Sequence, residues 1–142
     1  MKILLAVDGS KHALRAVDCL IEHADWYRTK PAIELVTVHL PLPKLPRMGL
    51  VVGKNQIQRY YEDEGEVCLR TAKKKLDAAG LRYKASILVG PVAETLVQHA
   101  VKSRCDLIFI GSRGRTGLRS ALLGSTAGKV LHISKTPVLL VR

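Results

Sequence analysis

The stretch from Gly111 to Thr126 contains the residue types that phosphate binding requires. It follows an apolar run, precedes a helical pattern, and has glycines at positions 111, 114 and 124. Glycines let the backbone approach an anion closely and can adopt positive φ where several amides must converge. Amides at the start of a helix, together with the positive end of its dipole, attract the same anion. We therefore predict a phosphate-binding loop at this position.

Side chains in this loop add donors and positive charge. The hydroxyls belong to Ser112, Thr116, Ser125 and Thr126, and the arginines are Arg113, Arg115 and Arg119. The whole chain has a net charge of +11, and residues 91–142 hold eight basic residues against two acidic ones, with no acid after position 106. This polarised charge favours a small triphosphate as the partner, and nucleic acid remains the alternative.

Two common phosphate-binding patterns do not fit the sequence. Between Gly124 and Gly128 there are three residues, and Lys129 is followed by valine, so the Walker pattern fails. The dinucleotide fingerprint is absent after the first apolar run, where Asp8 and Ser10 flank a glycine. We interpret Asp8 as a ligand-facing residue at the end of a strand and Ser10 as a helix N-cap.

The hydrophobic pattern alternates between short apolar runs and helical periodicity. Strands are predicted at 2–7, 33–40, 83–89, 106–110 and 137–141, and helices at 10–24, 55–79, 91–101 and 125–135. Prolines place a long loop at 41–53. Strict alternation of this kind predicts an α/β fold, in which a parallel sheet is covered by helices on both faces and linked by right-handed crossovers.

Length and composition define the broad class of protein. The chain has 142 residues, of which 47% are apolar and 25% charged, so we expect one globular domain over 1–142. Its apolar runs are far shorter than the ~18 residues of a membrane span, which predicts a soluble, cytoplasmic protein without a membrane partner. Neither the three cysteines nor the five histidines have the spacing of a disulfide framework or a metal site.

The spacing Gly-x₂-Gly-x₉-Gly-Ser, formed by Gly111, Gly114, Gly124 and Ser125, resembles the signature of the nucleotide-binding branch of the universal stress protein family. Further similar segments occur in the family's order, so the resemblance covers the whole chain. They are Ile3–Ser10, Leu35–His39, Gly90–Glu94, Asp106–Gly111 and Pro137–Val141.

The resemblance implies a doubly wound five-stranded sheet of order 3-2-1-4-5 that binds ATP, with Mg²⁺, at the carboxyl ends of strands 1 and 4. By the same resemblance Ala6 lines the adenosine side, and Asp8 faces the ribose or a phosphate-bound Mg²⁺. Val38 would hold adenine through its backbone. The ribose and phosphates would be wrapped by Ile110, Gly111, Ser112, Arg113, Gly114, Arg115 and Thr116. The β- and γ-phosphates would meet Gly124, Ser125 and Thr126.

The function implied is that of an ATP-binding stress-response regulator whose state depends on the bound adenine nucleotide. We expect slow ATP hydrolysis at most, because no residue of the loop is identifiable as a general base. The resemblance also implies a homodimer through Val138–Val141, an apolar edge strand that otherwise needs cover from a helix of the same chain.

Two alternatives from other classes are a basic RNA- or DNA-binding module and an adenylyl-transferring enzyme of related architecture. Only six aromatic residues are available for base stacking, and neither an H-x-G-H nor an S-G-G-x-D-S signature is present.

Overall fold

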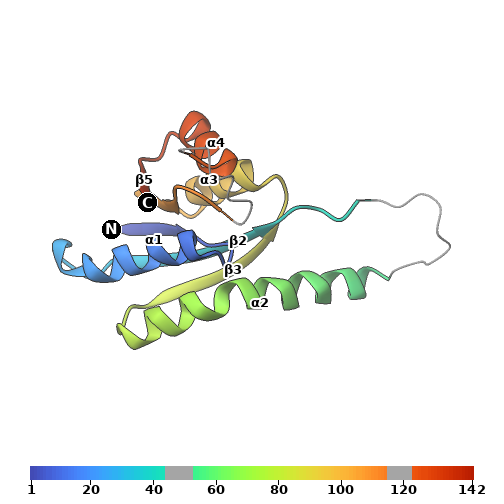
Figure 1. The fold of residues 1–142 in the computed structure, drawn as a ribbon, viewed down its shortest axis with the longest axis horizontal. Coiled ribbons are helices and arrows are strands. Elements are labelled where there is room, and N and C mark those ends of the chain that lie inside the picture. Colours follow the sequence, from blue (N-terminus) through green and yellow to red (C-terminus); the bar gives the residue numbers. More distant parts are fainter. Residues whose placement is uncertain (44–52, 115–122) are drawn as a thin grey trace.

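Five strands and four α-helices alternate along the described parts of the chain (Figure 1). The computed structural model describes residues 1–43, 53–114 and 123–142. The elements are β1 (Lys2–Ala6), α1 (Lys11–Glu22), β2 (Ala32–His39), α2 (Lys54–Ala78), β3 (Tyr83–Val89), α3 (Val92–Lys102), β4 (Leu107–Gly111), α4 (Ser125–Ile133) and β5 (Val138–Val141), with a 3₁₀ turn at Ala24–Trp26. The predicted elements are confirmed, with ends that shift by one to two residues in most cases.

The strands form one sheet of order β3-β2-β1-β4-β5, and every neighbouring pair is parallel. The α/β class and the 3-2-1-4-5 order are thus confirmed. The chain builds outward from β1 through β2 to β3, then returns to place β4 on the other side of β1. The direction of winding therefore reverses between β1 and β4, which is where open α/β sheets bind ligands.

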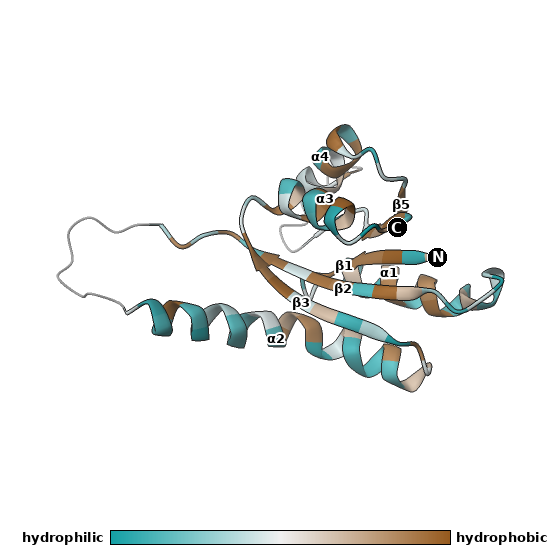
Figure 2. Ribbon diagram, turned by 180° about the vertical axis from the view of Figure 1, so that it is seen from behind, coloured by the Kyte–Doolittle hydropathy of each residue, from teal (hydrophilic) through white to brown (hydrophobic). Residues whose placement is uncertain are grey.

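Alternate side chains of the central strands pack on opposite faces of the sheet. Ile3 and Leu5 of β1 lie in the cluster formed with α1 and α2, and Leu4 and Ala6 lie in the cluster formed with α3 and α4. Figures 1 and 2 show these two helix pairs on either side of the sheet. Because both faces are covered, β1 and β4 are almost continuously apolar, whereas β2 also buries Glu34 and Thr37.

Gly65 lies inside α2, where a glycine costs helix stability relative to alanine. A Cβ at this position would lie 2.6 Å from side-chain atoms of Ile87 on β3. The glycine therefore lets α2 pack closely on the outer part of the sheet.

The two edges of the sheet are β3 and β5. None of the four β5 residues is buried in the single chain, and Leu139 is 37% exposed. No helix among the described residues is long and apolar enough to cross a membrane. Most of the predicted 41–53 loop, and the site candidates Arg115 and Thr116, lie outside the described residues.

Candidate functional site: a cavity at the switch point

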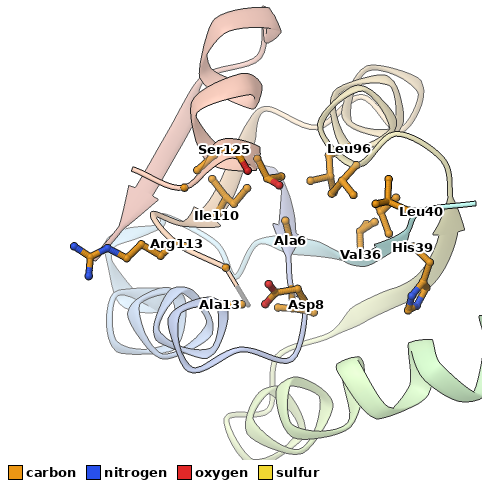
Figure 3. A pocket seen from close by; sticks show the side chains of 18 residues that line it. Ala6, Asp8, Ala13, Val36, His39, Leu40, Leu96, Ile110, Arg113 and Ser125 are labelled. Carbon is orange, nitrogen blue, oxygen red and sulfur yellow. The ribbon is translucent and has the colours of Figure 1, made fainter. Parts of the chain in front are cut away.

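A cavity of about 330 Å³ opens at the carboxyl ends of β1, β2 and β4. Its volume lies at the small end of the range for ligand pockets, about 300–1,000 Å³. The lining comes from these strands, the segments that follow them, and the helices α1, α3 and α4 (Figure 3). The lining residues are Ala6, Val7, Asp8, Ala13, Val36, Val38, His39, Leu40, Val92, Leu96, Ile110, Gly111, Arg113, Gly114, Gly124, Ser125, Thr126 and Ala127.

The cavity has an apolar end and a polar end. Figure 3 shows Val36, Leu40 and Leu96 together at one end, whereas Asp8 and Ser125 lie on opposite sides of the other, with Ala6 and Ile110 between them. A ligand that fits this arrangement has a flat or apolar part at one end and a group that accepts hydrogen bonds at the other.

The N-terminus of α4 forms one wall of the polar end. Its N-cap is Gly124, which provides no side-chain cap, and the first turn carries no acidic residue. In contrast, α1 is capped by Ser10, whose Oγ accepts a hydrogen bond from the Ala13 amide at 3.1 Å. Because the first amides of a helix have no partner within that helix, the α4 terminus can donate to an anion in the cavity.

Asp8 forms the opposite wall, two residues after the end of β1. One carboxylate oxygen, Oδ1, accepts a hydrogen bond from the backbone amide of Ser10 at 2.9 Å. The sharp turn that this bond closes passes through Gly9, whose φ of +79° is a conformation that favours glycine. The local sequence therefore fixes the Asp8 carboxylate at the polar end of the cavity.

The glycines of the predicted loop lie where the backbone closely approaches other atoms. None of the described glycines at 111, 114 and 124 has positive φ, so the left-handed conformation that glycine permits does not occur there. A Cβ on Gly111 would lie 2.6 Å from the carbonyl oxygen of His12, and one on Gly114 would lie 2.9 Å from Asp8 Oδ2. Gly111 is required by the close approach of β4 to α1, whereas a Cβ at position 114 would have to displace the Asp8 carboxylate.

Most of the site residues predicted from the sequence come together in this cavity: Ala6, Asp8, Val38, Ile110, Gly111, Arg113, Gly114, Gly124, Ser125 and Thr126. Ser112 is buried and is not among the lining residues, although its carbonyl accepts a hydrogen bond from the Gly124 amide at 2.7 Å. The Arg113 side chain points away from Asp8 and out of the cavity (Figure 3). The remaining two candidates, Arg115 and Thr116, lie outside the described residues.

The sequence-based prediction missed most of the apolar end. Val36 shares a face of β2 with Val38, so strand alternation could have identified it. His39 and Leu40 follow that strand, and the His39 ring lies beside Tyr61 of α2, with the ring centres 6.1 Å apart. No sequence signal pairs His39 with a helix that begins 15 residues later.

The described residues contain no group of three or more histidine, cysteine, aspartate or glutamate side chains that could hold a metal ion. Asp8 is the carboxylate that faces the polar end. Mg²⁺ usually binds through one or two carboxylates plus phosphate oxygens and water. This donor set fits a Mg²⁺ ion carried by a bound phosphate, with Asp8 as the protein ligand, and does not form an all-protein cage.

The fold and the cavity together define a doubly wound α/β protein with a ligand site at its switch point. A match to the Universal stress protein family spans residues 1–142. Universal stress protein MJ0531 of Methanocaldococcus jannaschii is 34% identical over 142 residues, which cover 99% of this chain and 81% of that protein. The chain belongs to the universal stress protein family.

Solved structures of the family have the same architecture. The structure of MJ0577 from Methanocaldococcus jannaschii, described as a hypothetical protein whose biochemical function was assigned from structure, superposes with a TM-score of 0.81 at 28% identity. The match covers 99% of this chain and 94% of that one. A universal stress protein in complex with cAMP superposes with a TM-score of 0.71 at 28% identity, covering 100% of this chain and 97% of that one.

Proposed function

We propose that this protein binds an adenine nucleotide, ATP with Mg²⁺, in the switch-point cavity. In this proposal it acts in the cytoplasm as a stress-response regulator whose state depends on the bound nucleotide. The observation that carries the proposal is the polarity of the cavity, in which an apolar end and an uncapped helix N-terminus lie at opposite ends of one space. The cAMP complex of a relative supports an adenine nucleotide as the ligand.

The apolar end takes the adenine in this proposal. The pairing between β1 and β2 ends at Ala6 and Val36, so Val38 continues past the end of β1. The backbone edge of Val38 on that side is therefore available to the amino group and ring nitrogens of adenine. A guanine presents a carbonyl where adenine presents an amine, so we expect ATP to bind more tightly than GTP.

The polar end takes the ribose and phosphates. The amides and hydroxyls of Ser125 and Thr126 donate to phosphate oxygens, and the glycines at 111, 114 and 124 keep the walls close without side chains in the way. Asp8 holds the ribose or the nucleotide's Mg²⁺, which when bound neutralises part of the phosphate charge. No lining residue near the phosphates in the described part of the chain is left to serve as a general base, so hydrolysis is slow at most.

Isothermal calorimetry with ATP, ADP, AMP, cAMP and GTP tests the proposal. Gly124→Val should weaken ATP binding by at least about tenfold, because a Cβ there already lies 3.3 Å from Arg113 Cα and the valine methyls must displace the segment that lines the phosphate end. Gly53→Val is the matched control, since a Cβ there meets nothing within 4 Å. If the wild-type protein binds none of these nucleotides and none copurifies with it, the proposal is wrong.

The proposed assembly is a homodimer that pairs through β5. This strand lies at the sheet edge, and the helices of the described chain leave Leu139 more than one-third exposed. Open apolar edges of this kind are normally covered. Sedimentation at micromolar concentration distinguishes a dimer from a monomer by mass.

A further inference from the structure

A second, smaller cavity of about 120 Å³ is lined by four basic residues and one serine. Its lining residues are His12, Arg15, Ser112, Arg113 and Arg142. They come from α1, from the segment after β4 and from the residue that follows β5. Arg113 lines both this cavity and the switch-point cavity, and its side chain points away from the latter (Figure 3).

The fold brings these residues together through close backbone contacts. Gly111 allows the end of β4 to lie against the start of α1, beside the carbonyl of His12. Arg15 follows His12 by three residues and so lies on the same face of that helix. The Ser112 amide donates a hydrogen bond to the Val141 carbonyl at 2.7 Å, which brings the end of β5 to the same place.

The basic side chains of this cavity have no carboxylate side chain of the described residues as an ion-pair partner. No ion pair among the described residues includes Arg15, Arg113 or Arg142, whereas Lys2, Lys73, Lys75 and Lys129 each pair with a carboxylate. None of the residues lining the cavity is acidic, and the first turn of α1 contains no acidic residue. Unpaired arginines around one concave space form an environment that favours a multivalent anion.

We propose that this second cavity binds a phosphate group, in the form of a phosphate monoester or a pyrophosphate unit. The planar guanidinium fork matches a phosphate through two parallel hydrogen bonds, and three arginines and a serine line this one small space. The phosphate can come from a separate small molecule. It can also be the end of a phosphate chain whose nucleoside lies in the first cavity, and only this second source rests on the function proposed above.

The first arm of the test measures binding of inorganic pyrophosphate to the full chain by calorimetry, without nucleotide. The double variant Arg15→Gln/Arg142→Gln should bind pyrophosphate at least about tenfold more weakly than the wild type, because each arginine contributes a charge-assisted hydrogen bond. Arg70→Gln, an exposed arginine on α2, removes one charge without touching the cavity and should leave the affinity unchanged. This arm does not depend on adenine nucleotide binding.

The second arm compares ATP with AMP in the same proteins. If the phosphate is the end of a nucleotide chain, the double variant should lose about tenfold in ATP affinity while AMP affinity stays constant. A loss in either arm supports the site and identifies the source of the phosphate.

The proposal is overturned if the double variant matches the wild type in both arms. It is also overturned if the double variant loses affinity for a single-stranded DNA oligonucleotide while its affinities for pyrophosphate and ATP stay unchanged. Failure of all nucleotides to bind, with pyrophosphate binding intact, would reject the proposed function and leave the phosphate site standing.

Discussion

Polar groups at the amino ends of the strands pair within the chain, whereas helix amides at the carboxyl ends face a cavity. Near the amino ends of the strands, the buried carboxylate of Glu34 accepts from Lys2 Nζ at 2.8 Å and lies 3.3 Å from His99 Nε2. The backbone amide of Lys2 in turn donates to Asp106 at 2.7 Å. At the carboxyl ends, the amides of α4 face a cavity without a side-chain cap from the described residues.

This difference separates groups that hold the fold together from groups that are available to a ligand. A buried charge that finds partners within the chain stabilises the fold only while those partners remain. Donors that converge on an open space contribute little to the fold and can bind what enters that space. Substitutions at the amino end should therefore change stability and leave ligand binding intact, and most substitutions at the carboxyl end should do the reverse.

Glu34→Ala should have the largest effect on stability. The substitution leaves the Lys2 ammonium and the His99 ring without their buried acceptor, which we expect to cost about 3 kcal/mol of unfolding free energy. Lys2 is one-third exposed and can turn toward water, so the loss lies at the low end for a buried pair. Urea denaturation measures the loss, and calorimetry with ATP should show unchanged affinity.

Asp18→Ala is the matched control for Glu34→Ala. Asp18 pairs with Lys75 at 2.7 Å, but both side chains are well exposed to solvent. Ion pairs of this kind contribute about 0–1 kcal/mol, so the control should lose less than one-third of the Glu34 effect. Equal losses in the two variants, or loss of ATP binding in Glu34→Ala, would contradict the proposed separation of the two ends.

Gly111→Ala tests an exception to the comparison of the two ends of the sheet. Gly111 lies at the carboxyl end of β4, but its substitution should affect mainly stability. The added methyl would lie 2.6 Å from the His12 carbonyl, so β4 and α1 must move apart. Overpacking of this kind costs about 2 kcal/mol, which urea denaturation can measure. Gly124→Ala, where the nearest atom is 3.3 Å away, should cost less than about 1 kcal/mol. Equal stability of the two variants would show that the close approach of β4 to α1 does not require glycine at position 111.

The fold could be predicted because its determinants are local or periodic. Apolar runs such as Ile3–Val7 and Leu107–Ile110 indicated strands buried on both faces, and Ser10 marked the start of α1. The strand order came from the resemblance and not from these patterns. Alternation alone predicts a parallel sheet, and several orders satisfy it.

Sequence analysis predicted the residues at the polar end of the candidate site and missed most of those at its apolar end. Gly124 and Ser125 belong to one continuous motif, whereas Leu96 of α3 reaches the cavity only through packing across the sheet. The role of Gly111 could not be predicted either, because its closest neighbour, His12, lies about a hundred residues away in the chain. Contacts between distant segments depend on side-chain packing, which a single sequence does not reveal.

The pH dependence of stability gives the smallest and most specific test. Burial alone would raise the pKa of the Glu34 carboxyl, but the hydrogen bonds and charges of Lys2 and His99 outweigh burial, so this pKa lies below its model-peptide value of 4.5. In the unfolded chain the carboxyl takes up a proton at higher pH than in the folded protein. The stability that the ionised carboxyl provides is therefore present above about pH 4.5 and is lost as the pH falls through the lower folded pKa.

Glu34→Gln cannot titrate, so the difference in unfolding free energy between wild type and this variant should shrink between pH 6 and pH 3. Denaturation at both pH values measures it, and a difference that stays constant would show that the ionised Glu34 carboxyl does not stabilise the amino end of the sheet.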